Sequence, residues 1–217
     1  MSQMLLDIAP EWVPSLDNFV AGRNIELLSV LRETTSAQII YLWGAAGGGK
    51  THLLQAMVAR ARTEGRAAHY ACGVVPEAVE VVAVDDVETL DDSAQIALFE
   101  LYNRMREQGG LLLASGAQAP AHLELRDDLR TRLGWGLVYQ VHALNDAEKA
   151  DALRQHAGAR GFELPPEVVT YLLRHGRRDL PSLLALLDAL DEHCLRLKRL
   201  ASVPLLKEVI QQLSGLK

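Results

Sequence analysis

The chain has 217 residues, 49% of them hydrophobic, and a net charge of −6. This length suits one domain with a smaller appendage and allows a core that needs no disulfide. Because cations alternate with acids instead of forming a basic stripe, direct DNA reading is not expected. No segment reaches the ~18 apolar residues of a membrane span, so we expect a cytoplasmic protein with no membrane association. Cys72 and Cys194 form no Cys-x-x-Cys pair and are expected to be buried, reduced thiols.

The first predicted region, residues 1–23, is an extended arm. Pro10 and Pro14 break any helix there, and the segment shows little periodicity. Arms of this kind commonly carry contacts to partner proteins.

The second region, residues 24–143, alternates apolar strand-like runs with amphipathic segments of helical spacing. Such alternation predicts crossover units, and therefore an α/β domain with a parallel sheet between two layers of helices. The expected strands are 38–43, 67–71, 79–84, 111–114 and 137–141, and the expected helices are 24–32, 51–64 and 93–108.

The third region, residues 144–217, contains only helical patterns and is predicted to form a small helical lid. Asn145 followed by Glu148 is typical of a capping box at the start of the first helix. The prolines Pro165 and Pro166 separate that helix from the next one, near 167–175. A leucine-rich helix is expected from 179 to about 200, and a fourth after Pro204.

A nucleotide is predicted at the end of the first strand, where eight residues fit the phosphate-loop pattern G-x-x-x-x-G-K-[ST]. They are Gly44, Ala45, Ala46, Gly47, Gly48, Gly49, Lys50 and Thr51. Glycines let backbone N–H groups face the phosphates, and the following helix, which continues with His52, adds its positive end. We expect Lys50 to reach the β- and γ-phosphates and Thr51 to bind Mg²⁺. A plain Gly-rich turn is disfavoured because a strand precedes the pattern and an amphipathic helix follows it.

A second motif follows the strand at 79–84, where four apolar residues lead into Asp85 and Asp86. This arrangement has the form of a Walker B strand. We expect Asp85 to bind the Mg²⁺ shell, and Asp86 stands where a general base would orient a water molecule. For Asp86 the alternative, an acidic helix cap, stays equally open.

Two arginines are candidates for contacts with phosphate. Arg132 comes just before a Gly-Trp-Gly turn that would place it at the surface, where it could act in trans on a neighbour's γ-phosphate. Arg178 lies at the start of a lid helix and could point at the bound nucleotide. Spacing alone favours ordinary surface residues at both positions.

In their order along the chain, these motifs resemble the AAA+ ATPases of the DnaA replication-initiator group. The segment 15–24 is similar to the one that frames the adenine in that group, which implies nucleotide contacts for Phe19 and Val20. The segments 128–136 and 160–165 are similar to the Hda family of DnaA regulatory inactivators. The chain also stops where DnaA would continue into a basic DNA-binding domain, so DNA contact is expected to be only indirect.

The arm adds to this resemblance, because it is similar to the Q-x-x-L-x-[LF] peptide with which Hda proteins bind the sliding clamp, the β subunit of DNA polymerase. The matching residues are Gln3, Met4, Leu6 and Ile8. An extended peptide of this kind can bury its apolar side chains in a groove while the glutamine bonds at the rim.

The resemblance implies an ADP-bound negative regulator of replication initiation. With the DNA-loaded clamp, it would stimulate hydrolysis of ATP bound to DnaA, with Arg132 at the finger position and Arg178 at the sensor II position. The chain departs from the DnaA pattern after the strand 111–114, where Ser115 replaces an aspartate. Ser115 could still contact phosphate, but weak or no intrinsic ATPase activity is expected.

Two other functions stay open. An autonomous AAA+ ATPase, such as a helicase loader, would share the phosphate loop, although the missing acid argues against it. A nucleotide-dependent adaptor would bring a partner to the clamp without promoting hydrolysis. The sequence does not determine whether ADP or ATP is bound, or whether the protein forms a homodimer.

Overall fold

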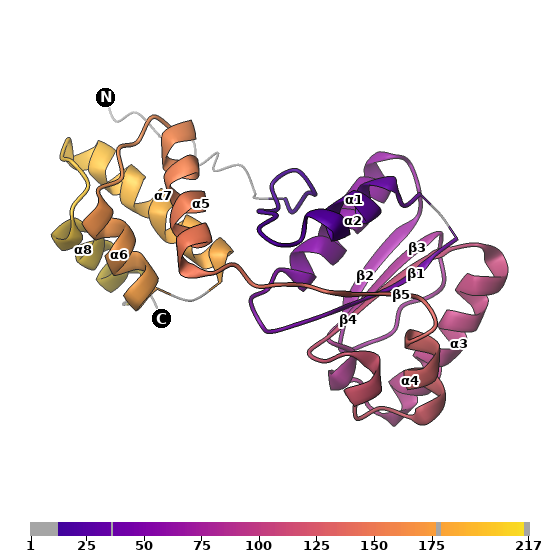
Figure 1. Cartoon of the computed structure of the whole chain (residues 1–217). Helices are drawn as coiled ribbons and strands as arrows, with labels where there is room; N and C mark the ends of the chain where they lie inside the picture. Colours follow the sequence, from indigo (N-terminus) through magenta and orange to yellow (C-terminus); the bar gives the residue numbers. More distant parts are fainter. Residues whose placement is uncertain (1–12, 36, 177–178, 215–217) are drawn as a thin grey trace. The chain divides into compact units, whose positions relative to one another are not determined.

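The computed structural model describes residues 13–35, 37–176 and 179–214 (Figure 1). Among them the chain forms two compact units. An α/β unit comprises 13–19, 25–44 and 49–141, and a helical unit comprises 20–24, 45–48 and 142–214. The predicted clamp-binding residues Gln3, Met4, Leu6 and Ile8, and the predicted sensor residue Arg178, lie outside the described residues.

The α/β unit is built on a five-stranded parallel sheet of order β2-β3-β4-β1-β5. Its strands are β1 (Ile39–Trp43), β2 (Ala68–Cys72), β3 (Val81–Asp85), β4 (Leu111–Gly116) and β5 (Leu137–Gln140). The buried residues of β3 and β4 form nearly continuous apolar runs, as expected for strands that are covered on both faces. The predicted α/β fold is therefore confirmed.

Helices cover both faces of this sheet (Figure 1). The helices α1 (Ile25–Glu33) and α2 (Lys50–Thr63) lie on one side, and α3 (Asp92–Gln108) and α4 (Asp127–Leu133) on the other. Tyr41 and Leu112 belong to the core packed against α3 and α4. Because side chains alternate along a strand, their neighbours Ile40 and Leu113, also fully buried, face the opposite layer.

The short helix α4 was not among the predicted elements. It has seven residues, and its N-cap Arg126 makes no side-chain capping bond. Its apolar signal is limited to Leu129 and Leu133, both fully buried. Helices this short are marginal alone, so packing of these two leucines supplies what local sequence lacks. Two 3₁₀ turns, η1 (Val87–Thr89) and η2 (Pro120–His122), follow β3 and β4.

The helical unit contains α5 (Asp146–Ala159), α6 (Pro166–His175), α7 (Leu180–Leu197) and α8 (Val203–Ser214). These helices share an apolar core in which Leu153, Leu172 and Leu190 are fully buried. The capping box predicted for α5 is present, with the side chain of Asn145 accepting from the backbone N–H of Glu148. The helical lid segment thus forms its own core.

The exposure of the two cysteines differs from the prediction. Cys194 is buried in α7, but Cys72 is exposed, so the expectation was wrong for this residue. Cys72 ends β2, the edge strand of the sheet, and therefore lies outside the core. Across the described ranges, no helix combines the length and apolar character that a membrane crossing requires.

Candidate nucleotide site and surface arginine

The phosphate loop connects the end of β1 to the first turn of α2, and its backbone requires glycine at two positions. Gly44 has φ +151°, and a Cβ atom there would lie 2.4 Å from the carbonyl oxygen of Val141. Gly49 has φ +101°, and a Cβ atom there would lie 2.6 Å from the ring of Phe19. Any other residue would therefore clash or be strained at both positions.

Between these glycines the loop is mostly open to solvent. Ala45, Ala46 and Gly47 are exposed, whereas Gly48 is buried and donates its N–H to the carbonyl of Ala45 at 3.2 Å. Gly47 also has a left-handed φ of +74°. Consecutive turns of this kind point backbone N–H groups into a concave surface, which suits an anion.

Lys50 and Thr51 begin α2 directly after the loop. Lys50 is only 7% exposed, and its Nζ atom donates to the carbonyl of Gly44 at 2.8 Å. Its ammonium group is thus held at the loop. Thr51 is exposed in the first turn, and Gly49 provides no side-chain cap for the helix. The N-terminal N–H groups of α2 therefore keep their capacity to bind an anion.

The described part of the arm packs against this same first turn. The ring of Phe19 lies 5.4 Å from that of His52, centroid to centroid, and Nε2 of His52 is 2.8 Å from the carbonyl of Ser15. Burial lowers the pKa of His52, partly offset by its bond to Ser15, so the ring is neutral near pH 7. Phe19 and His52 thus form an aromatic wall beside the loop, and Val20 is half-buried next to Phe19 in the chain.

At the end of β3, the Asp85 side chain is 1% exposed and accepts several hydrogen bonds. The hydroxyl of Tyr70 on β2 donates to its Oδ2 atom at 2.8 Å, and the hydroxyl of Ser115 on β4 donates to Oδ1. Ser115 is itself fully buried. Tyr70 was not among the predicted site residues, because only the pairing of β2 with β3 brings it beside Asp85.

Asp86 follows in a left-handed backbone conformation, with φ 49° and ψ 58°. Burial raises the pKa of its carboxyl group, and the charges of Asp85 and Glu88 raise it further, whereas Lys50 opposes them. A general base works best with a pKa near the working pH, so this shift is in the direction that a base requires.

The oxygen atoms of Asp85 and Thr51 suit a magnesium ion that is bound together with a nucleotide. Within the described ranges, no group of three or more His, Cys, Asp or Glu residues could hold a metal. Mg²⁺ is usually bound by one or two carboxylates together with phosphate oxygens and water. Asp85 and the hydroxyl of Thr51 therefore fit such an ion only when phosphates complete its shell.

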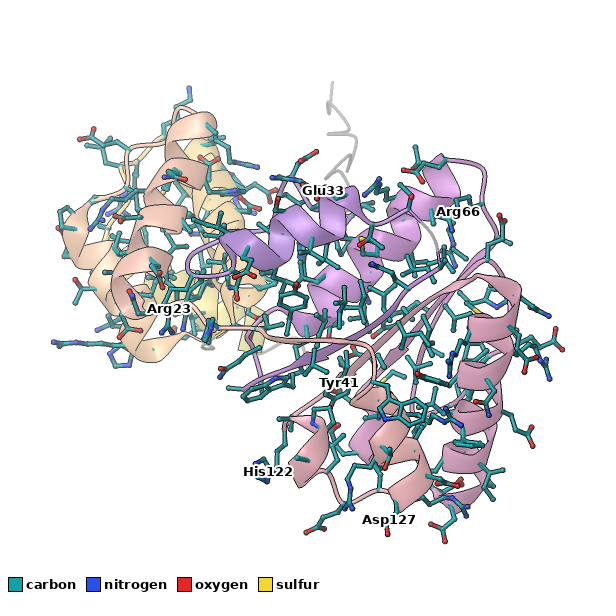
Figure 2. All side chains as sticks on the ribbon, turned by 45° about the vertical axis from the view of Figure 1, so that its right-hand side comes forward. Arg23, Glu33, Tyr41, Arg66, His122 and Asp127 are labelled. Atoms are coloured by element: carbon teal, nitrogen blue, oxygen red, sulfur yellow. The ribbon has the colours of Figure 1, made fainter. Side chains whose placement is uncertain are left out.

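Arg132 differs in its partners from Arg130 of α4 and from Arg126, the N-cap of that helix. Arg126 pairs with Asp128 at 3.0 Å, and Arg130 pairs with Asp127 at 2.8 Å. Both pairs involve the N-terminal turn of α4, whose first residue, Asp127, is labelled in Figure 2. Among the described residues, no carboxylate pairs with Arg132. Its guanidinium carbon instead lies 4.3 Å from the ring centroid of Trp135.

Two further rings, Phe99 and Tyr102 of α3, lie 5.7 and 5.8 Å from the same guanidinium. Arg132 is half-buried and Trp135 is 61% exposed, so the expected surface position holds only in part. An arginine over aromatic faces keeps its charge and its hydrogen-bond donors available. The Gly-Trp-Gly turn predicted only the location of Arg132, and the contact between Trp135 and Arg132 was not predicted.

Known proteins resemble the chain in two ways. The family model described as "Hda, lid domain" matches residues 146–210. Among solved structures, domain III of the replication initiation protein DnaA from Thermotoga maritima has a TM-score of 0.73 and 20% identity. That match covers 91% of this chain and 95% of the other.

DnaA from Aquifex aeolicus bound to AMPPCP has a TM-score of 0.69 and 23% identity, covering 82% of this chain and 65% of the other. The Holliday junction branch migration motor RuvB from Thermotoga maritima has a TM-score of 0.65 and 15% identity, covering 91% and 71%. The chain therefore has the AAA+ P-loop fold shared by DnaA and RuvB, with a lid similar to that of Hda.

Proposed function

We propose that this protein binds ADP or ATP and acts as an Hda-type negative regulator of replication initiation. Its partners would be the DnaA initiator and the DNA-loaded sliding clamp, and its effect would be faster hydrolysis of DnaA-bound ATP. The fold of DnaA domain III and the Hda-like lid support this proposal. The observation that carries it is the position of Arg132.

Arg132 has the properties required of an arginine finger supplied to another protein. Its neighbours Arg126 and Arg130 are neutralised by carboxylates, whereas no described carboxylate neutralises Arg132. The exposed Trp135 beside it adds an aromatic anchor, and Trp and Arg are enriched at the energetic centres of interfaces. We infer that this surface meets the nucleotide-holding face of DnaA.

The protein's own nucleotide would be regulatory. Lys50, Thr51 and the loop glycines supply the phosphate contacts, and Phe19 with His52 would lie beside the base. Intrinsic hydrolysis would be weak, because Ser115 replaces an acid and its hydroxyl is directed at Asp85 rather than at a phosphate. Arg178 would contribute a further cation from the lid.

Clamp binding is proposed on sequence alone. Met4, Leu6 and Ile8 would enter an apolar groove on the clamp while Gln3 bonds at its rim. Through the clamp the protein would reach DNA only indirectly and would be associated with the nucleoid. Pull-down by the clamp, with Gln3→Ala and Leu6→Ala as the disrupting pair, tests this step separately from hydrolysis.

The test of the proposal is the rate of hydrolysis of DnaA-bound ATP in the presence of DNA-loaded clamp. We expect the wild-type chain to accelerate it and Arg132→Ala to lose this effect almost entirely, since arginine fingers contribute about 10³-fold or more. Arg130→Ala is the matched control, because Arg130 already has a carboxylate partner in α4. Equal rates of DnaA-bound ATP hydrolysis with wild type and with Arg132→Ala would contradict the proposal.

A clamp-targeting adaptor is the second candidate function. The observation that favours it is the contact of Arg132 with Phe99, Tyr102 and Trp135, which could make the arginine a part of a docking surface and nothing more. In that case the clamp and DnaA would both bind while the hydrolysis rate stays flat. An autonomous ATPase would instead show steady-state hydrolysis that Asp86→Asn abolishes.

A further inference from the structure

We propose that Tyr70 is a positioning residue that holds the carboxylate of Asp85 and thereby weakens the preference of the site for nucleotide with Mg²⁺. This inference rests on the proposed nucleotide binding but not on any action toward DnaA. Tyr70 lies on β2, outside the phosphate loop and outside the strand that carries Asp85. Its hydroxyl donates to Oδ2 of Asp85 at 2.8 Å.

Asp85 has few hydrogen-bond acceptor sites left for a further ligand. A carboxylate oxygen can accept about two hydrogen bonds. Oδ1 of Asp85 accepts one from the hydroxyl of Ser115 and one from the backbone N–H of Asp86, at 3.2 Å, so both of its sites are used. Oδ2 accepts from Tyr70 and keeps one site. Tyr70 therefore occupies half of the remaining capacity of a side chain that is 1% exposed.

Tyr70 acts on Asp85 as a neutral hydrogen-bond donor. Its contact with Oδ2 at 2.8 Å joins a hydroxyl group to a carboxylate oxygen, and the hydroxyl group supplies the proton of this bond. The side chain of Gln55 forms a second hydrogen bond with the same tyrosine.

Through Gln55, Tyr70 is also connected to the helix that follows the phosphate loop. Gln55 lies on α2, four residues after Thr51, so the two side chains share one face of the helix. The chain of bonds runs from Gln55 to Tyr70 to Asp85. Tyr70 therefore links the Asp85 carboxylate to the helix that carries Thr51, the residue expected to bind Mg²⁺.

The hydroxyl of Tyr70 takes one of the two acceptor sites of Oδ2, so only one site remains there for Mg²⁺ or for a water molecule of its shell. Removing the hydroxyl leaves Oδ2 of Asp85 without its protein donor, and a buried acceptor without a partner is costly. Mg²⁺ and its water molecules, brought by the nucleotide, could then relieve this cost. We therefore expect Tyr70→Phe to increase the effect of Mg²⁺ on nucleotide binding.

The experiment titrates the full-length chain with fluorescent mant-ATP, once in excess Mg²⁺ and once in EDTA. The measured quantity is the dissociation constant in EDTA divided by that in Mg²⁺. We expect Tyr70→Phe to raise this ratio about tenfold over wild type, close to the lower end of the range for hydrogen bonds to charged groups. A purely structural role would shift both dissociation constants together and leave the ratio unchanged.

Tyr41→Phe is the matched control. Tyr41, labelled in Figure 2, also lies on a strand of the same sheet, but its hydroxyl donates to the backbone carbonyl of Gln118 at 2.9 Å. Its ratio should equal that of wild type. If Tyr70→Phe does not fold, Ser115→Ala removes the hydroxyl donor from the other oxygen of Asp85 and should raise the ratio in the same way.

An unchanged or lower ratio in a folded Tyr70→Phe variant overturns the role of Tyr70, while nucleotide binding itself stands. A wild-type chain that binds mant-ATP in neither condition overturns the nucleotide site, and this inference with it. Loss of stimulated DnaA hydrolysis in Arg132→Ala is independent of both results.

Discussion

The helical unit and the α/β unit satisfy their polar groups in different ways. In the helical unit, Asn145 and Asp179 cap their helices, and Arg160 bonds Asp191 at 3.0 Å and lies 3.4 Å from Asp188. Local sequence and tertiary structure agree at most positions of this unit, with an exception at the C-cap of α7, where Lys198 has a left-handed φ of 53°. In the α/β unit, Asp85 is buried beside Asp86, whose backbone is left-handed, and Arg132 has no described carboxylate partner.

This difference between the two units indicates that the functional residues lie in the α/β unit. Sequences generally obey local rules, and departures from them persist where the surrounding structure enforces them for another purpose. The departures in the α/β unit concern residues at the carboxyl ends of β1, β3 and β4 and at the end of α4. The helical unit, by contrast, is explained largely by leucine packing and helix caps.

The largest expected effect is the loss of stability when a buried leucine of the helical unit is replaced. Leu172 is fully buried in its core, so we expect Leu172→Ala to lower the free energy of unfolding by about 2–5 kcal/mol, measured by urea denaturation. Leu200→Ala is the control, because this leucine is 84% exposed and should cost little. Similar losses for the two variants would mean that apolar burial does not hold this unit together.

A second effect should appear in ligand binding and not in stability. Lys50→Ala removes the ammonium group held at the phosphate loop, and we expect ADP to bind about 100-fold more weakly in a mant-ADP titration. Lys207→Ala, in the helical unit, is the charge-matched control and should bind ADP normally. If Lys50→Ala binds ADP as tightly as wild type, Lys50 of the α/β unit contributes no more to ADP binding than Lys207 of the helical unit.

The smallest effect is a pH dependence that arises from Asp86. Its pKa is raised above the ordinary value of 3.8, so the folded state keeps an extra proton just above that pH, and stability falls as pH rises through the folded pKa. Asp86→Asn should therefore be more stable than wild type at about pH 7, with the advantage shrinking toward about pH 4.

Denaturant midpoints at both pH values measure this effect, and Glu124→Gln, at an exposed position, is the charge-matched control. An advantage of Asp86→Asn that is the same at both pH values would point to relief of backbone strain instead of charge.

Long periodic segments and short motifs were predictable because their signals are local. The strand before Gly44, the helix that starts at Lys50 and the capping box at Asn145 each follow from neighbouring residues. The helix α4 was missed because Leu129 and Leu133 stabilise it only through burial against the rest of the unit. Cys72 was misjudged because an apolar residue at the end of an edge strand is not covered.

The sequence by itself determined the alternation that produces a parallel sheet, and the phosphate-loop pattern with Lys50 and Thr51 at its end. Only the tertiary structure decided that Tyr70 and Ser115 both donate to Asp85, and that Trp135 lies against Arg132. The physical reason is that hydrogen bonds and ring contacts between distant residues depend on strand order and helix packing. Strand order and helix packing cannot be read from a periodic pattern in the sequence.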